Sequence, residues 1–192
     1  MTALASSYCT WHIGQCQINM IFDFAGLVLL AAFQLFAMSF TYPWHAQCTI
    51  HWSIDDSCSS VQTKLENQIN LWTNNECPSI SDSCPKMPCG QKCKYRLTES
   101  TEDGIIKATH KTPVKEYVDY LTLNLTSNNK NECQISGHST SGTWYAVLDF
   151  GTNYCNLRNL IDGAGLDKEE GFQEFTANDV CTQYDSRDCT RF

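Results

Sequence analysis

Cysteine is the residue that most constrains what this chain can fold into. The sequence of 192 residues contains 12 cysteines. Ten of them follow a long apolar run, and these are Cys48, Cys58, Cys77, Cys84, Cys89, Cys93, Cys133, Cys155, Cys181 and Cys189. A dense set with an even number of cysteines is typical of a disulfide framework formed in an oxidising compartment. We therefore predict that all ten are disulfide candidates, although their order along the chain does not determine the pairing.

The densest part of this set, residues 76–93, contains four of the ten cysteines. A metal site, a redox centre and a stapled loop are the three alternatives. Structural zinc sites favour paired cysteines two to four residues apart with a longer loop between the pairs, and redox centres favour Cys-x-x-Cys. The last three cysteine spacings could be forced into a zinc site, but no neighbouring histidine supports it, and no Cys-x-x-Cys occurs. Pro78, Pro85, Pro88 and Gly90 disfavour regular structure. The sequence favours a stapled surface loop.

The apolar run, Met20–Phe40, favours secretion. Its core, residues 24–38, has the length of a signal peptide, and Ala37-Met38-Ser39 supplies the small residues that precede a cleavage site. We predict a leader and signal peptide over residues 1–39 and a single secreted, Cys-rich domain over residues 40–192. The alternative is an uncleaved anchor, and a membrane is a partner only if Met20–Phe40 is not removed. Either Met1 or Met20 is compatible with being the true start.

The charge of the chain excludes some classes of partner. Its formal net charge is -8, and only 13 residues are Lys or Arg, of which the first is Lys64. Nucleic-acid-binding proteins present clusters of basic residues to the phosphate backbone. Because the sequence has no such cluster, we predict no nucleic-acid partner.

Hydrophobic periodicity predicts one helix near the start of the mature chain. Five residues fall at steps of three and four, which places them on one helical face; they are Cys58, Val61, Leu65, Ile69 and Trp72. Asp55, Asp56 and Ser57 precede this stripe and are good residues for a helix N-terminus. We therefore predict an amphipathic helix that ends near residues 74–78.

After Cys93 the hydrophobic period changes to two, which is typical of strands. We predict strands within residues 93–98, 105–111, 117–126, 133–139 and 143–150, a short helix over residues 152–163 with Thr152 or Asn153 as its cap, and a last strand in the tail. We interpret residues 40–56 as irregular. The resulting fold class is α+β, with one amphipathic helix packed on a four- to five-stranded antiparallel sheet stabilised by disulfides. This order of elements resembles the architecture of cystatin-like, helix-gripping folds.

A catalytic reading depends on a few polar residues. The segment "GHSTSG", residues 137–142, matches a nucleophile elbow at Gly137 and Ser139 but not at its fifth position. His110 and His138 are predicted on or beside strands, where they could meet across the sheet. A secreted hydrolase using Ser139, His110 or His138 is therefore one alternative, but we assign no catalytic residue, metal ligand or cofactor. The asparagines of residues 154–160 are interpreted as satisfying buried backbone groups.

The function expected from these observations is a small secreted binding or interaction module, whose partner is an unknown extracellular protein or a small apolar ligand. A cystatin-like protease inhibitor is the second alternative. Cystatins carry a Gln-x-Val-x-Gly loop, and the resemblance extends only to "QISG" at residues 134–137, which is one residue too short.

The sequence also contains one acceptor site for N-glycosylation. Asn124-Leu125-Thr126 is the single Asn-x-Ser/Thr sequence in the chain. A glycan must project into solvent, and successive strand residues point to opposite faces. We predict that Asn124 is glycosylated and that Leu121, Leu123 and Leu125 face the core.

Overall fold

The computed structural model describes residues 8–12, 15–19, 44–74, 77, 90–128 and 132–190. The chain divides into two compact units, Met1–Thr41 and Tyr42–Phe192. In the first unit, β1 (Tyr8–His12) pairs with the antiparallel strand β2 (Gln15–Asn19). Within the described residues, no helix is both long enough and apolar enough to cross a membrane. The predicted signal sequence and its cleavage site lie outside the described residues.

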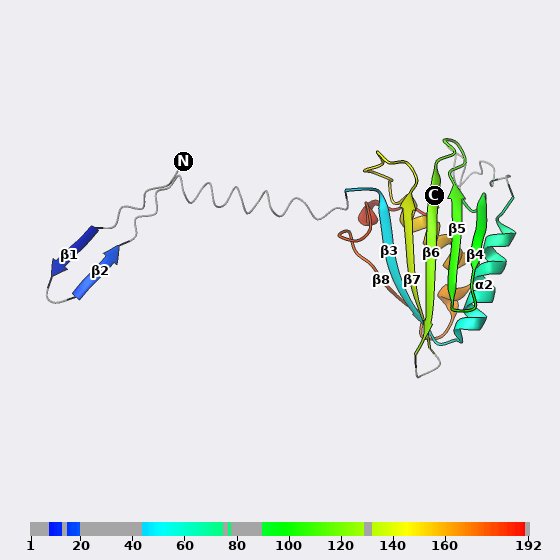
Figure 1. The fold of residues 1–192 in the computed structure, drawn as a ribbon, viewed down its shortest axis with the longest axis horizontal. Helices are drawn as coiled ribbons and strands as arrows, with labels where there is room; N and C mark the ends of the chain where they lie inside the picture. The colour runs from blue at the N-terminus through cyan, green and yellow to red at the C-terminus, as the bar shows by residue number, and fades with distance from the viewer. Residues whose placement is uncertain are drawn as a thin grey trace. The chain divides into compact units, whose positions relative to one another are not determined.

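The second unit contains a six-stranded antiparallel sheet (Figure 1). Its strands, in spatial order, are β4 (Tyr95–Ser100), β5 (Ile105–Lys111), β6 (Val118–Ser127), β7 (Cys133–Ser141), β3 (Gln47–Ile54) and β8 (Gln173–Phe175). The strands β4 to β7 form a meander, in which each strand pairs with the next along the chain. Along the chain, β3 is the first strand of this sheet, and it lies between β7 and β8. A helix follows β3 and precedes β4, which lies at the far edge of the sheet.

Two helices cover one face of this sheet. They are α2 (Cys58–Leu71), which packs mainly on β4, and α3 (Thr152–Gly163), which packs mainly on β7 and β3. Figure 1 shows α2 at the β4 side and α3 behind the middle of the sheet. Two short 3-10 helices, η1 (Leu166–Lys168) and η2 (Tyr184–Ser186), follow α3. The core therefore forms between the two helices and the inner face of the sheet.

The predicted amphipathic helix is confirmed as α2. Its N-cap is Ser57, whose hydroxyl oxygen accepts a hydrogen bond from the Ser60 backbone N–H. Val61, Leu65 and Ile69 are fully buried, as the stripe predicts. The helix at residues 152–163 is also present as α3, but its N-cap is Gly151 rather than Thr152 or Asn153. The predicted architecture packed one helix on the sheet, whereas in the structure both α2 and α3 pack on it.

The inner and outer faces of β6 are also as predicted. Leu121, Leu123 and Leu125 are buried, whereas Asn124 between them is exposed. The buried leucines lie in the same hydrophobic cluster as Val61 and other residues of α2. The α+β fold class is therefore confirmed, with six strands in place of four or five.

Among the described residues of the second unit there are four disulfides. Their members are Cys48–Cys181, Cys58–Cys133, Cys77–Cys93 and Cys155–Cys189. The Cys77–Cys93 bond closes the segment that we interpreted as a stapled loop, and its two sulfurs are thereby not available to a metal. Cys84 and Cys89 lie outside the described residues. Cys58–Cys133 connects α2 to β7, and Cys48–Cys181 and Cys155–Cys189 connect the C-terminal tail to β3 and α3.

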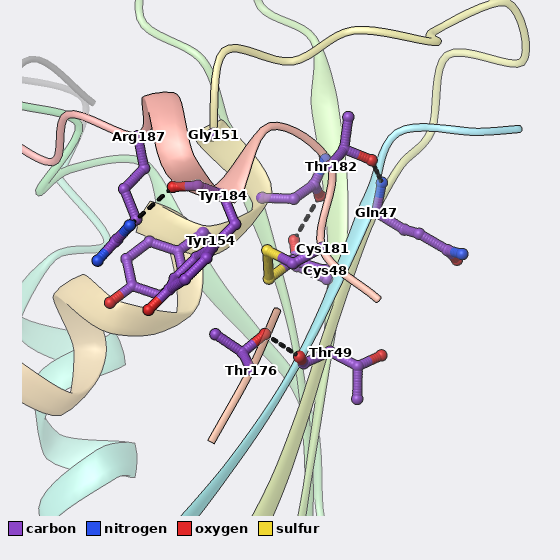
Figure 2. Close-up of a disulfide and its surroundings, with 12 residues drawn as sticks. Gln47, Cys48, Thr49, Gly151, Tyr154, Thr176, Cys181, Thr182, Tyr184 and Arg187 are labelled. Atoms are coloured by element: carbon purple, nitrogen blue, oxygen red, sulfur yellow. Dashed lines mark hydrogen bonds between the residues drawn. A yellow bond between two sulfur atoms is a disulfide. The ribbon is translucent and has the colours of Figure 1, made fainter. Parts of the chain in front are cut away.

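The C-terminal tail is held along β3 by hydrogen bonds around one of these bridges (Figure 2). The Gln47 backbone N–H donates to the Thr182 hydroxyl at 3.2 Å, and the Thr182 N–H donates to the Gln47 carbonyl at 2.8 Å. Further along, the Thr176 hydroxyl donates to the Thr49 carbonyl at 2.7 Å. The Cys48–Cys181 disulfide therefore reinforces a tail that already pairs with β3.

Two parts of the secondary-structure prediction are wrong. Residues 47–54, interpreted as irregular, form β3, because Ile50, Trp52 and Ile54 alternate with residues on the open face and are buried by α3 and β7. Residues 143–150, predicted as a strand, form a loop. This loop follows the end of β7, and in the described part of the chain it is paired with no strand of the sheet.

Gly137 and Gly142 of the "GHSTSG" segment have packing roles. A Cβ atom at Gly137 would lie 2.7 Å from the Trp52 ring, so glycine is needed for the indole to cross β7. A Cβ atom at Gly142 would lie 2.7 Å from the Val118 carbonyl oxygen. The glycines of this segment are explained by close approach within the sheet rather than by a strand-to-helix elbow.

Candidate functional site

A pocket opens at one end of the sheet, between two loops. The loops are residues 112–117, which join β5 to β6, and residues 142–151, which join β7 to α3. Because β5 and β7 run in the same direction, the loops that follow them lie at the same end of the sheet (Figure 1). The pocket between them has a volume of about 700 Å³. This volume is within the range of about 300–1,000 Å³ that is common for small-molecule sites.

The upper walls of the pocket are mostly apolar and come from both loops. The apolar lining residues are Pro113, Val114, Tyr117, Tyr145, Ala146, Val147, Leu148 and Phe150. Several of these large side chains are more than half exposed, including Leu148 at 64% and Phe150 at 62%. Large apolar side chains gathered in one exposed region commonly mark a binding surface.

The loop from β7 to α3 is held in place by hydrogen bonds to three other segments. The Gln183 side-chain oxygen accepts from the backbone N–H groups of Asp149 and Phe150, at 2.9 and 2.7 Å. The Ala146 carbonyl accepts from the Ala46 N–H at 2.8 Å, and the Gly142 N–H donates to the Val118 carbonyl at 2.7 Å. The apolar wall on this side is therefore preformed.

The deep part of the pocket is polar. Gln91, Asp119, Ser141, Asp149, Thr152 and Asn153 line it. Asp119 is the central residue, with 3% of its surface exposed, and its Oδ2 accepts a hydrogen bond from Asn156 Nδ2 at 2.8 Å. A buried carboxylate below apolar walls gives the pocket two chemically distinct ends.

A polar row crosses the inner face of the sheet at this level. In the strand register, Tyr95 lies opposite His110, His110 opposite Asp119, and Asp119 opposite Ser141. The rings of Tyr95 and His110 have centroids 4.4 Å apart, and the Tyr95 hydroxyl donates to the Asn156 carbonyl at 2.9 Å. Directly opposite residues on one face are close neighbours in an antiparallel sheet. Asp119 is thus part of a continuous buried polar layer.

Asparagines on α3 cover this layer. Asn153, Asn156 and Asn159 are spaced three residues apart, so they lie on one side of the helix, and each is 1% exposed. The Ser139 hydroxyl donates to Asn153 Oδ1 at 2.7 Å. Asn156 and Asn159 were interpreted as partners of backbone groups, but the Asn156 side-chain amide donates to the buried side chains of Asp119 and Ser139. The inner face of the sheet therefore provides polar side chains, such as Ser139 and Asp119, that hydrogen-bond to the asparagines of α3.

Asp149 orients the start of α3. Its Oδ1 accepts from the Gly151 N–H at 3.1 Å, and its Oδ2 accepts from the backbone N–H and the side-chain amide of Asn153 at 3.0 and 2.8 Å. A carboxylate at a helix N-terminus satisfies free N–H groups and interacts well with the helix dipole. Asp149 consequently fixes both the loop wall and Asn153 in the pocket floor.

Burial changes the proton affinity of the groups in this layer. Desolvation raises the pKa of Asp119 to about 6, and the nearby Asp149 charge adds to this effect. Desolvation also raises the pKa of Asp149. It lowers the pKa of His110 to about 4, because the buried imidazole is more stable uncharged. At neutral pH Asp119 is therefore mainly ionised, beside a neutral histidine in the same polar layer.

The structure separates the residues of the hydrolase alternative. Ser139 and His110 are both fully buried on the helix-covered face. His138 lies on the opposite face, where its Nδ1 is 3.0 Å from the Thr49 hydroxyl. The expectation that His110 and His138 could meet across the sheet is wrong, because their positions in the pleat place them on opposite faces. Residues 134–137, compared with the cystatin loop, lie inside β7 between β6 and β3.

Sequence reasoning missed the residues that define the pocket floor. Asp119 is two residues before Leu121 and therefore shares the inward face of β6. An ionisable residue at the inward position of an alternating strand is the signal that could have identified it. Asp149 and Gln91 had no comparable signal, because each is in an irregular segment whose position depends on the tertiary fold.

No family model and no curated protein matches this chain. One solution NMR structure, of a protein from Thermobifida fusca, is 13% identical to it, with a TM-score of 0.35. The match covers 63% of this chain and 85% of the other. A likeness at this level carries no conclusion about fold or function.

Proposed function

We propose that this protein is a secreted, disulfide-stabilised binding module whose pocket between residues 112–117 and 142–151 holds a small, largely apolar ligand. The observation that carries the proposal is the pocket itself, with a volume of about 700 Å³ and walls made of apolar side chains from two loops. Ligand pockets are typically apolar with a few convergent polar groups, and this one combines apolar walls with a buried polar floor.

The disulfides support the extracellular part of the proposal. Four bridges join segments as far apart as Cys48 and Cys181, and their cysteines Cys48, Cys93, Cys133, Cys155 and Cys181 are fully buried. Buried structural bridges of this kind form and persist in oxidising compartments and are rare in the cytosol. Together with the signal-like segment over residues 20–40, they favour export.

Expression of the full chain in animal cells tests the compartment. We expect the protein in the medium, with a first residue near Phe40 by N-terminal sequencing or mass spectrometry. Recovery only in the membrane fraction, with Met20–Phe40 retained, would contradict secretion and support the anchor alternative.

Binding of a neutral apolar dye tests the pocket. N-phenyl-1-naphthylamine becomes fluorescent in apolar surroundings, so titration with the secreted protein should give saturable fluorescence with one site per chain. Leu148→Gln removes an apolar wall residue that is already exposed, and we expect it to weaken dye binding about five- to tenfold. A variant that binds the dye as tightly as the unmodified protein would contradict the assignment of this pocket.

Leu71→Gln is the matched control for this experiment. Leu71 is 69% exposed at the end of α2, and it does not line the pocket. The two variants therefore make the same chemical change at similar exposure. Dye affinity should stay within about twofold in the control, and equal losses in both variants would indicate nonspecific dye adsorption.

A further inference from the structure

We propose that the floor of this pocket receives the ammonium group of an amphipathic amine, whose apolar body lies against the loop walls. This inference rests on the proposed binding function and specifies the chemistry of the ligand. The argument depends on the polar groups that the floor presents, on the charges nearby and on the position of the floor below the apolar walls.

The first step is that the floor presents hydrogen-bond acceptors. Asp119 and Asp149 both line the pocket, and each carries carboxylate oxygens that only accept hydrogen bonds when ionised. Gln91 lines the same pocket and is 7% exposed, and its buried Oε1 has no hydrogen-bond partner in the part of the chain that the structure describes. A buried acceptor without a partner costs stability, so a ligand that donates hydrogen bonds would compensate for it.

The second step is that Asp119 is only partly satisfied by the protein. Its oxygens accept from the Asn156 amide at 2.8 Å and from the Ser141 side chain. An ionised carboxylate can accept about four hydrogen bonds. Asp119 therefore retains accepting capacity at the base of the pocket, whereas the Asp149 carboxylate is used by Gly151 and Asn153 to hold the helix start.

The third step concerns charge. Asp119 and Asp149 are close enough for the charge of one to raise the pKa of the other. The charged residues that line the pocket are these two and Lys115, which is exposed on the loop at the rim. His110, beside Asp119 in the sheet, is neutral at pH 7 because burial lowers its pKa to about 4. A ligand cation at the floor would offset the repulsion between the carboxylates, and an anionic head group would increase it.

The fourth step is the arrangement of the two ends. The apolar walls of residues 143–150 surround the entrance, and the acceptors lie in the polar layer between α3 and the sheet. A ligand with a donor-rich cationic end and an apolar body matches both ends at once. A bare metal ion would leave the apolar walls without a partner, and a fatty acid would place its carboxylate against two others.

Three probes of equal chain length test this inference, namely decylammonium, decanol and decanoate. Each is titrated against the secreted protein at pH 7.5, below its aggregation concentration, by displacement of N-phenyl-1-naphthylamine and by calorimetry. We expect decylammonium to bind about tenfold more tightly than decanol, because charge-assisted hydrogen bonds are stronger than neutral ones. Decanoate should bind most weakly of the three.

Asp119→Asn tests the residue responsible. The amide keeps the shape of the side chain and removes the charge, so the preference for decylammonium over decanol should fall to about twofold or less. Asp103→Asn makes the same change at an exposed position in the turn between β4 and β5, and it should retain the full preference. An unchanged preference in Asp119→Asn would overturn the assignment of the floor as the cation site.

The probe ranking of the unmodified protein distinguishes the two proposals without any variant. If the dye binds and decylammonium is no tighter than decanol, the ammonium inference is wrong while the pocket remains a binding site. If neither the dye nor any of the three probes binds, both proposals are wrong. If decylammonium is preferred and the preference depends on Asp119, both are supported.

Discussion

Asn156 Nδ2 donates a hydrogen bond to Asp119 Oδ2 across 2.8 Å, and this bond joins α3 to β6 beneath the pocket. Both residues are almost completely buried. A hydrogen bond to a charged group contributes more than a neutral one, and a buried acceptor that loses its donor bears the cost of desolvation. The position of α3, and with it one wall of the pocket, therefore depends on this pair.

Asn156→Ala should lower the free energy of unfolding by about 2–3 kcal/mol at pH 7.5, because it removes one of the hydrogen-bond donors of a buried carboxylate. The loss should be smaller at pH 5, where Asp119, with a pKa of about 6, is largely protonated. Urea unfolding at both pH values measures the effect. Asn67→Ala is the control, since Asn67 is an exposed asparagine within α2 and the change in helix propensity is the same.

Asp119→Asn should change how stability depends on pH. Desolvation raises the pKa of this carboxyl in the folded protein from its ordinary value of 3.8 to about 6. The folded state therefore holds the proton more tightly, and the contribution of Asp119 to stability decreases as pH rises from about 4 to about 6. Because the amide does not titrate, the variant should gain about 2–3 kcal/mol relative to the unmodified protein between pH 4 and pH 7.5.

The difference between the two proteins is the quantity to measure for Asp119→Asn. His110, with a folded pKa of about 4, contributes the opposite trend, since its stability contribution rises with pH up to about 6.5. The free energy of unfolding is measured against pH for the variant and for the unmodified protein. Subtracting one pH profile from the other removes the contribution of His110. A difference that does not vary with pH would mean that Asp119 is not buried in the way described.

Leu123→Ala should destabilise the domain by about 2–5 kcal/mol, because it truncates a fully buried side chain on the inner face of β6. Thr122→Ala, one residue earlier and on the open face, should change stability by no more than about 0.5 kcal/mol. Thermal or urea unfolding of the two variants decides the matter. A larger loss at Thr122 than at Leu123 would contradict the strand register.

Asn124 should carry an N-linked glycan in protein secreted from animal cells. The side chain is exposed on the open face of β6, opposite the face that α2 and α3 cover, and it begins the sequence Asn-Leu-Thr. Enzymatic removal of N-glycans should reduce the mass of the protein, and Asn124→Gln should abolish that shift. The same mass before and after digestion would show that the site is not used.

Loss of the Cys58–Cys133 bridge should cost more than loss of Cys77–Cys93. The two bonds close sequence separations of 75 and 16 residues, and longer loops lose more entropy in the unfolded chain when cross-linked. Paired Cys→Ala variants should lower the free energy of unfolding by about 4 and about 3 kcal/mol, respectively, in the chain-entropy account. Denaturant unfolding without reductant measures both, and the reverse order would contradict the entropic explanation.

Local patterns in the sequence determined a substantial part of this structure. The step of three and four residues from Val61 to Ile69 specified α2, and the alternation from Leu121 to Leu125 specified both faces of β6. The density of cysteines indicated a disulfide framework. These features follow from short-range periodicity or composition, so they do not require knowledge of which segments are neighbours.

Tertiary structure alone decided the pairing of the cysteines, the place of β3 between β7 and β8, and the pocket. The two pocket walls, residues 112–117 and 143–150, lie opposite each other only because β5 and β7 end at the same end of the sheet. Asp149 caps α3, and Asp119 receives its hydrogen bond from Asn156, because α3 folds back over the meander. The sequence determined which residues could be buried, and long-range packing determined which of them meet, because a local period contains no information about distant partners.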